Sequence, residues 1–341
     1  MDEEGRGNAQ RKKLTNIDSG EREESNRECS LLGFSLRRAT VSLARSDSLE
    51  LLLLYDSKIT SVEFDGWATP KLRELWLSNN LLTSIPAFRC DSLELLFLYD
   101  NKITSVEFDG WATPKLRELY LYNNLLTSVP AFKSDSLEIL NLRDNKITSV
   151  EFHGWATTKL RDFAIARNPL SGLPSAAIKG MKNLETFHCY ESNLGPTLLR
   201  GVLEFQSKAL KLVTLWGNNI SEVEEGAITG LGPNTEIFLT NNEIVVLSEE
   251  SFRPMLDILS KGYGVLNLTG NPIRCDCDIA WLVLNEKFLT SISGKCHNGT
   301  ELKDLDVFAM KDCGRQSNVS ASTTQAVDRE LGQLRLSLHN L

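Results

Sequence analysis

Residues 47–88 read DSLELLLLYDSKITSVEFDGWATPKLRELWLSNNLLTSIPAF, and residues 91–132 read DSLELLFLYDNKITSVEFDGWATPKLRELYLYNNLLTSVPAF. The two segments lie 44 residues apart and differ at five positions, which are 53/97, 57/101, 76/120, 78/122 and 85/129. Each segment holds two shorter units that begin LxxLxLxx and continue with Asn or Ser. A unit of this size can bury its apolar face only against a neighbouring copy, so the stretch predicts a solenoid of stacked repeats.

The pattern extends beyond these two segments. Ten units begin at Leu49, Leu72, Leu93, Leu116, Leu137, Leu160, Leu184, Leu210, Asn234 and Tyr263. Successive starts lie 21 to 29 residues apart, and the motif resembles that of the leucine-rich-repeat superfamily. The resemblance covers about residues 47–313 and implies an α/β fold, a curved horseshoe with a parallel sheet on its concave face. An array of amphipathic helices is the alternative, and Asn in register at eight of the ten units argues against it.

Each position of the repeat has an expected direction. Apolar positions 1, 4, 6 and 11 point into a shared core, while positions 3, 5 and 7 face outward because side chains alternate along a strand. Position 9 is Asn in eight units, at residues 80, 101, 124, 145, 168, 218, 242 and 271. A buried Asn can hydrogen-bond the backbone of adjacent turns, so we expect this column to hold the turns together. Ser57 and Ser192 interrupt the column, and we expect looser turns there.

The outward positions carry many aromatic side chains. Three of the five differences between the quoted segments fall on outward positions 5 and 7. The rings that we predict to bind a partner are Tyr55, Trp76, Phe97, Tyr99, Tyr120, Tyr122 and Trp216. A wide exposed aromatic patch is typical of a binding surface. Two alternatives remain open: the rings stabilise the sheet by stacking, or recent duplication multiplied one harmless ring.

Four cysteines follow the last repeat. Cys275, Cys277, Cys296 and Cys313 lie within CDCDIAWLV and GKCHNGTELKDLDVFAMKDC. The open end of a solenoid exposes its core, so we expect these residues to build a cap, with a helix from near Asp278 packed on the final repeat. A zinc site is the alternative, but a CxC pair with distant partners is a poor match to metal knuckles, and we predict no metal. The sequence by itself leaves three disulfide connectivities open.

The cap, together with repeats that read NKITSVEFDGW, resembles the cysteine-rich C-terminal flank of extracellular leucine-rich-repeat proteins, and of secreted arthropod members most closely. The resemblance implies the pairs Cys275–Cys296 and Cys277–Cys313. It also implies a secreted, non-enzymatic protein that accompanies a separate catalytic chain. It covers the later repeats and the cap, but not residues 1 to about 45.

Both ends of the chain are polar. We divide the chain into a disordered or misassigned leader (1–45), about ten repeats (46–273), the cap (274–313) and a flexible tail (314–341). The first residues hold no apolar signal segment, so we expect that Met1 is not the natural start. A disulfide-linked cap predicts an oxidising, extracellular location, with glycans on Asn219, Asn298 and Asn318. A cytoplasmic location with reduced cap cysteines is the alternative.

Composition and motifs narrow the function. The formal net charge is −8 and no basic run stands out, so nucleic acid is not an expected partner. No apolar stretch is long enough to span a membrane. The four histidines are scattered and no phosphate loop or nucleophile motif is present, so we predict no catalytic residues and no cofactor. The expected function is secreted recognition of a protein, or of a glycan or microbial surface. The alternatives are a non-catalytic subunit that stabilises an oxygenase-type catalytic chain, and an intracellular scaffold.

Overall fold

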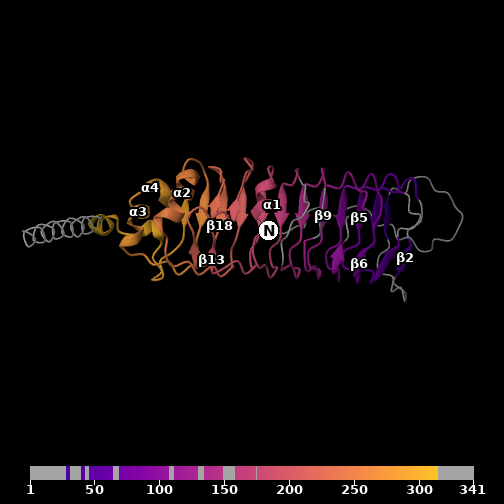
Figure 1. The fold of residues 1–341 in the computed structure, drawn as a ribbon, viewed down its shortest axis with the longest axis horizontal. Helices are drawn as coiled ribbons and strands as arrows, with labels where there is room; N and C mark the ends of the chain where they lie inside the picture. Colours follow the sequence, from indigo (N-terminus) through magenta and orange to yellow (C-terminus); the bar gives the residue numbers. More distant parts are fainter. Residues whose placement is uncertain are drawn as a thin grey trace, which may run out of the picture. The chain divides into compact units, whose positions relative to one another are not determined.

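The computed structural model describes residues 28–30, 40–42, 46–63, 69–106, 111–129, 134–148, 158–173 and 175–313. They belong to two compact units, divided after Asn168. Each unit is a stack of parallel strands (Figure 1). The predicted tail (314–341) lies outside the described residues, as does most of the predicted leader.

The first unit is built on one parallel sheet. Its strands, in order, are β1 (Glu28–Ser30), β3 (Leu51–Leu53), β5 (Glu74–Trp76), β7 (Leu95–Phe97), β9 (Glu118–Tyr120), β10 (Ile139–Asn141) and β11 (Asp162–Ala164). Two short pairs form outside this sheet: β2 (Thr40–Ser42) with β4 (Ser61–Glu63), and β6 (Ser84–Ile85) with β8 (Ser105–Val106). In the strands from β3 to β11 the middle residue, position 4, is buried. The predicted inward direction of position 4 is therefore confirmed here, while position 5 is also buried in β10 and β11.

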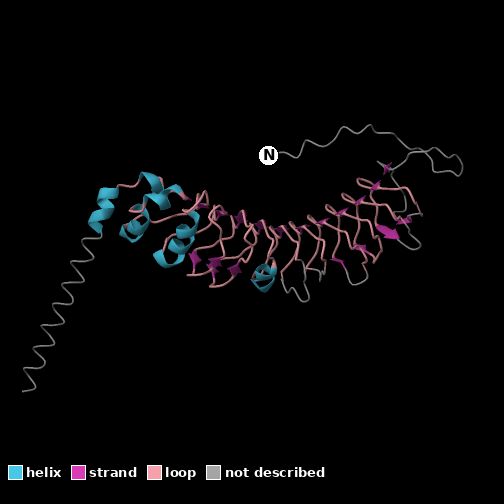
Figure 2. Cartoon of the chain, turned by 90° about the horizontal axis from the view of Figure 1, so that it is seen from above, coloured by secondary structure: helices cyan, strands magenta, loops and turns pink. Residues whose placement is uncertain are grey.

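The second unit repeats this plan with longer connections. Its sheet runs β12 (Thr186–His188), β15 (Leu212–Thr214), β18 (Glu236–Phe238), β19 (Val265–Asn267) and β20 (Ile292–Ser293). Two-residue pairs also form, β13 (Thr197–Leu198) with β16 (Glu222–Val223) and β14 (Leu203–Glu204) with β17 (Ile228–Thr229). The wider repeat spacing gives room for α1 (Ser175–Gly180) and α2 (Glu249–Leu259) (Figure 2). The sheet strands of the two units place a strand in each of the ten predicted repeats.

The predicted leader needs correcting at two places. Strands β1 and β2 both lie within residues 1–45, and β1 pairs in parallel with β3, which belongs to the first predicted repeat. A strand at the edge of a sheet presents unpaired backbone groups, so an extended segment can join it without the full repeat motif. The sheet therefore begins before the first LxxLxL pattern.

The asparagine column holds successive turns together. All eight asparagines are buried. Asn124 shows the pattern: its Nδ2 donates to the carbonyls of Leu98 and Leu121 at 3.0 Å each, and its Oδ1 accepts from the Ile103 amide at 3.0 Å. At the interruptions, the Ser57 amide donates to Asn80 Oδ1 and the Ser192 amide to Asn218 Oδ1. The next repeat thus anchors the serine turns as well.

Position 8 has a backbone conformation that was not predicted from the repeat motif. It lies in the left-handed region in all ten repeats, at residues 56, 79, 100, 123, 144, 167, 191, 217, 241 and 270. Gly, Asn and Asp tolerate this region best, and they fill eight of the ten positions. Arg167 and Glu191 are the exceptions. The αL turn ends each sheet strand and brings the position-9 side chain inward.

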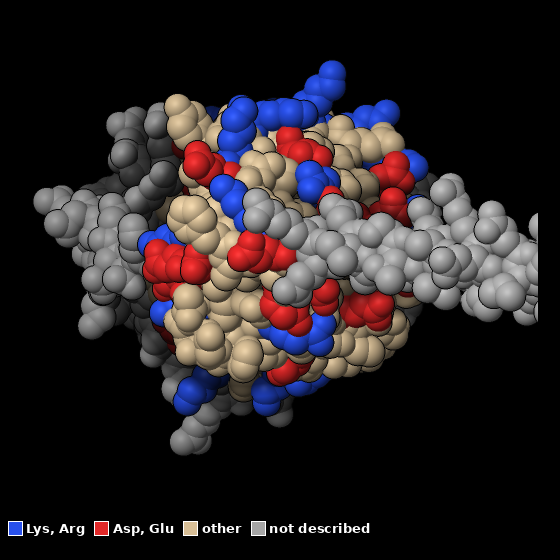
Figure 3. Space-filling model, turned by 90° about the vertical axis from the view of Figure 1, so that its left-hand side faces the viewer, with Lys and Arg blue, Asp and Glu red and all other residues tan. Residues whose placement is uncertain are grey.

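The C-terminal cap closes the second unit. Disulfides join Cys275 to Cys296 and Cys277 to Cys313, which is the pairing that the resemblance implied. The cap contains η2 (Cys277–Ile279), α3 (Ala280–Val283), α4 (Glu286–Thr290) and η3 (Leu302–Asp304). Ile279 and Leu282 are buried, and Trp281 Nε1 donates to the Leu247 carbonyl at 3.2 Å. Acidic and basic side chains intermingle on its outer side (Figure 3).

Candidate binding site

Six predicted rings form two columns on the outward face of the first unit. The position-5 column contains Trp76, Phe97 and Tyr120. Its neighbouring centroids are 4.0 and 4.9 Å apart, with interplanar angles of 29° and 8°. The position-7 column contains Tyr55, Tyr99 and Tyr122, and Tyr99 stacks on Tyr122 at 4.5 Å and 5°. We call these two columns together the aromatic face.

Neighbouring carboxylates orient two of these rings. Trp76 Nε1 donates to Glu74 Oε2 at 3.3 Å, and the Tyr120 hydroxyl donates to Glu118 Oε2 at 2.9 Å. Both acids occupy position 3 of the same strand as the ring. All six rings are half-buried. Stacking and these hydrogen bonds restrict the rotamers before any partner arrives, which lowers the entropic cost of binding.

Ser78 interrupts the position-7 column. It occupies the place of a ring in the repeat between Tyr55 and Tyr99, and its own side chain is buried. A hollow of about 230 Å³ opens there, lined also by Trp76 and by three residues of the position-8 turns, Asp56, Asn79 and Asp100. The flanking tyrosines were among the predicted binding residues, whereas Ser78, Asp56 and Asp100 were not. The signal was present, because position 78 is one of the five differences between the quoted segments.

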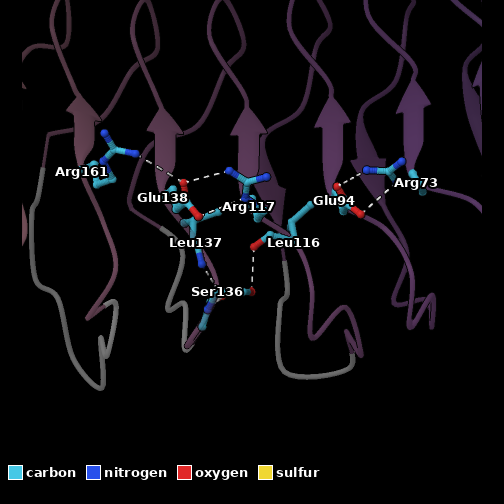
Figure 4. A network of polar contacts seen from close by, with 9 residues as sticks. Arg73, Glu94, Leu116, Arg117, Ser136, Leu137, Glu138 and Arg161 are labelled. Atoms are coloured by element: carbon cyan, nitrogen blue, oxygen red, sulfur yellow. Dashed lines mark hydrogen bonds and ion pairs between the residues drawn. The ribbon is translucent and has the colours of Figure 1, made fainter.

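A charged ladder runs along position 2 of the first unit, where Glu and Arg alternate: Glu50, Arg73, Glu94, Arg117, Glu138 and Arg161. Arg73 pairs with Glu94 at 2.8 Å, and Glu138 lies between Arg117 at 3.0 Å and Arg161 at 3.8 Å (Figure 4). Hydrogen bonds from Arg73 and Arg117 hold the pKa values of the Glu94 and Glu138 carboxyls below their ordinary range. Exposed pairs of this kind contribute little stability, and each pair joins two consecutive repeats.

The remaining ring of the prediction lies in the second unit. Trp216 stacks on Tyr190, with centroids 4.4 Å apart and an interplanar angle of 8°. Both side chains occupy position 7 of neighbouring repeats and are half-buried. Tyr190 was not among the predicted binding residues, although its position in the repeat matches that of Trp216.

Metal-ligating and nucleophilic side chains are scattered over the described residues. Within the ranges given above, no three His, Cys, Asp or Glu side chains come together as a metal site would require. Cys90 and Cys189 are unoxidised and buried, and burial raises the pKa of the Cys189 thiol to about 12. A thiol that stays protonated is a poor nucleophile. No helix in the described part of the chain has the length and hydropathy of a membrane span.

The sequence also predicted glycan attachment at three asparagines. Asn219 and Asn298 are exposed, while Asn318 lies outside the described residues. Asn298 Oδ1 accepts a hydrogen bond from the Thr300 amide at 3.0 Å within its turn.

Comparison with known proteins supports the repeat fold. A family described as leucine-rich repeats (2 copies) matches residues 70–110, 91–134 and 114–155. The chain is 29% identical over 157 residues to the Oplophorus-luciferin 2-monooxygenase non-catalytic subunit of Oplophorus gracilirostris. That match covers 38% of this chain and 42% of the relative, so it spans less than half of either protein.

Two solved structures share the fold. One is a chain of the octameric complex of Latrophilin 3, Unc5D and FLRT2, with a TM-score of 0.59, 20% identity, and coverage of 80% of this chain and 93% of that chain. The other comes from the Drosophila Toll–Spatzle complex, with a TM-score of 0.57, 19% identity, and coverage of 76% and 38% respectively. At these identities the likeness shows the fold alone. The chain is thus a leucine-rich-repeat solenoid with a disulfide-bonded C-terminal cap, and part of it resembles the Oplophorus subunit.

Proposed function

We propose that this chain is an extracellular, non-catalytic binding protein that holds a partner protein on the aromatic face. The observation that carries the proposal is the pair of ordered ring columns on one side of the first sheet. Aromatic side chains dominate binding energy at protein interfaces because they bury much area with few rotatable bonds.

The rest of the same sheet argues against a purely structural role for the rings. Strands β10 and β11 continue the parallel pairing in register. Their outward positions 5 and 7 hold Asn141, Arg143, Ala164 and Ala166, none of which is aromatic. The parallel register therefore continues without stacked rings, so register alone does not explain the rings of the earlier repeats.

Two observations support the extracellular part of the proposal. The cap contains two disulfides, and disulfides persist in oxidising compartments. Asn219 and Asn298 are exposed within acceptor sequences and so are accessible to glycosylation.

A second candidate narrows the partner to a catalytic chain. The name of the Oplophorus relative describes it as a non-catalytic subunit of a monooxygenase. By analogy, the partner of this chain would be an enzyme that the solenoid stabilises. The same aromatic face would serve as the contact.

The first experiment tests the location. The chain is secreted from eukaryotic cells behind an added signal peptide, and its intact mass is measured with and without thiol alkylation under denaturing conditions. We expect the four cap cysteines to resist alkylation and glycan mass to be present. Four alkylated cap cysteines without glycan would contradict the extracellular part of the proposal.

The same secreted protein then tests the aromatic face. It is used to capture partners from extracellular fluid of the source tissue, beside the Trp76→Ala/Tyr120→Ala variant. We expect a partner to be retained by the wild type and lost by the double variant, whose circular dichroism stays native. Tyr263→Ala is the matched control, because Tyr263 is an exposed ring of the second unit, and it should retain the partner. Equal capture by all three proteins, or an unfolded double variant, would overturn the proposal. A captured glycan in place of a protein would contradict the partner class.

A further inference from the structure

We propose that the hollow over Ser78 receives the guanidinium group of an arginine side chain from the partner protein. This inference rests on the proposed function, because it names the chemistry that the aromatic face recognises. Its starting point is the gap in the position-7 column, where a serine replaces a ring between Tyr55 and Tyr99.

The size of the gap suits one planar group. Tyr55 and Tyr99 stand two strands apart, and two strand spacings amount to about 9.6 Å. A group stacked between two rings needs two stacking distances of at least about 4.5 Å each. The Tyr99–Tyr122 pair of the same column is spaced at 4.5 Å. The strand spacing on either side of Ser78 therefore matches the thickness of one flat group.

The charge of the rim favours a cation. Asp56 and Asp100 line the hollow, and no lysine or arginine is among its lining residues. The nearest lysines along the chain, Lys58 and Lys102, are exposed and do not line it. Asn79 donates to Asp56, and Asn123 donates to Asp100. A carboxylate that accepts one hydrogen bond still has lone pairs for another donor.

The chain itself places an arginine against a ring of this column. The guanidinium carbon of Arg143, at position 7 of the following repeat, lies 5.8 Å from the centroid of the Tyr122 ring. A cation over a tyrosine face is attracted by the ring quadrupole. The position-7 column thus already includes one guanidinium after its last tyrosine, and the hollow offers the same kind of contact between its first two.

Arginine fits the hollow better than the other candidates. Its planar fork can stack on a ring and donate to a carboxylate at the same time, whereas the lysine ammonium is a compact, strongly hydrated point charge. An inserted aromatic ring would stack but would leave both carboxylates desolvated without a new donor. No arginine of the described residues lines this hollow, and we therefore assign the guanidinium to the partner protein.

The test uses a small probe, so that it does not depend on finding the partner. The blocked peptide acetyl-Gly-Arg-Gly-amide is titrated into the full chain with ring-labelled tyrosine, followed by NMR. The chain has six tyrosines, which single Tyr→Phe variants assign. We expect saturable shifts of Tyr55 and Tyr99 and an unmoved Tyr263. The citrulline peptide, which has the same shape without the charge, should bind at least about fivefold more weakly.

Matched variants separate the hollow from its surroundings. Ser78→Tyr fills the gap with the residue found 44 positions later, at Tyr122, and should abolish the shifts. Ser78→Ala keeps the gap and should bind like the wild type. Asp56→Asn/Asp100→Asn keeps both the shape of the hollow and the left-handed turns. It should reduce the affinity for the arginine peptide to that for the citrulline peptide.

Four outcomes would overturn the inference: no saturable shift with the arginine peptide, equal binding of the citrulline peptide, unchanged binding to a folded Ser78→Tyr variant, or tighter binding of acetyl-Gly-Phe-Gly-amide. These outcomes leave the proposed function standing if the wild type still captures a partner through Trp76 and Tyr120. If the wild type captures no partner through Trp76 and Tyr120 but still binds the arginine peptide, the proposed function is wrong. The hollow would then remain a guanidinium site without that function.

Discussion

Positions 7 and 9 of the repeats lie only two residues apart, yet they are occupied in opposite ways. Position 9 is Asn in eight of ten repeats, while position 7 holds Tyr, Ser, Arg, Ala, Trp and Thr. The Asn side chains point into the turns and hydrogen-bond the backbone of two repeats. The position-7 side chains lie on the outward face of the sheet. The backbone hydrogen bonds favour Asn at position 9, whereas the side chain at position 7 varies in size and charge.

The largest effect should follow from removing one member of the asparagine column. Asn124→Ala leaves the carbonyls of Leu98 and Leu121 and the Ile103 amide without their partner. Buried polar groups without partners are costly, so we expect the free energy of unfolding to fall by about 3 kcal/mol in urea denaturation. The control is Asn123→Gly, the exposed neighbour in the left-handed region, which should change stability much less. Similar losses of unfolding free energy in Asn124→Ala and Asn123→Gly would refute the contrast between the buried position 9 and its exposed neighbour.

A moderate effect should follow from opening a second gap in the position-7 column. Tyr99→Ser copies the neighbouring Ser78 and removes the stack on Tyr122. Ring stacking contributes about 1 kcal/mol, so we expect the free energy of unfolding to fall by about that amount in the same urea denaturation experiment. Tyr263→Ser is the control, because Tyr263 is 90% exposed. The free energy of unfolding of this variant should equal that of the wild type. A loss as large as that of Asn124→Ala would mean that the outward rings are structural.

The smallest effect concerns the charged ladder. Hydrogen bonds from Arg73 lower the pKa of the Glu94 carboxyl, so Arg73→Gln should raise that pKa toward its ordinary value. Because the folded pKa is lowered, the contribution of the pair is present above the unfolded pKa and disappears as the pH falls through the folded pKa. Carboxyl NMR titration measures the change, and Glu138, which keeps Arg117, serves as the control in the same molecule. If the titration midpoint of Glu94 is the same in the wild type and in Arg73→Gln, the ion pair is absent in solution.

Much of the fold was predictable because the repeat pattern and the backbone geometry agree. The inward positions 4 and 6 follow from strand alternation, and the asparagine column follows from the need to satisfy buried turns. Strand β1 was not predictable from the motif, since an edge strand can pair through its backbone alone. The left-handed position 8 was visible as a row of Asp, Asn and Gly but was not interpreted.

The candidate site was predictable only in part. Sequence placed the rings on outward positions, but stacking geometry depends on rotamers that the pattern does not encode. The hollow over Ser78 was hidden for the same reason, because a missing side chain matters only when its neighbours on adjacent strands are known. The order of the position-2 ladder could have been read from the alternation of Glu and Arg.

That alternation has a consequence for how such a chain can change its length. Deleting one repeat, such as the one that carries Glu94, would bring Arg73 beside Arg117 and put two like charges on adjacent strands. Deleting a full 44-residue segment would leave every neighbour opposite in sign. Position 8 also alternates with a period of two repeats. Asp occupies residues 56, 100 and 144, and Asn79, Asn123 and Arg167 lie between them. A change of length by two repeats therefore keeps opposite charges on adjacent strands, and a change by one repeat does not.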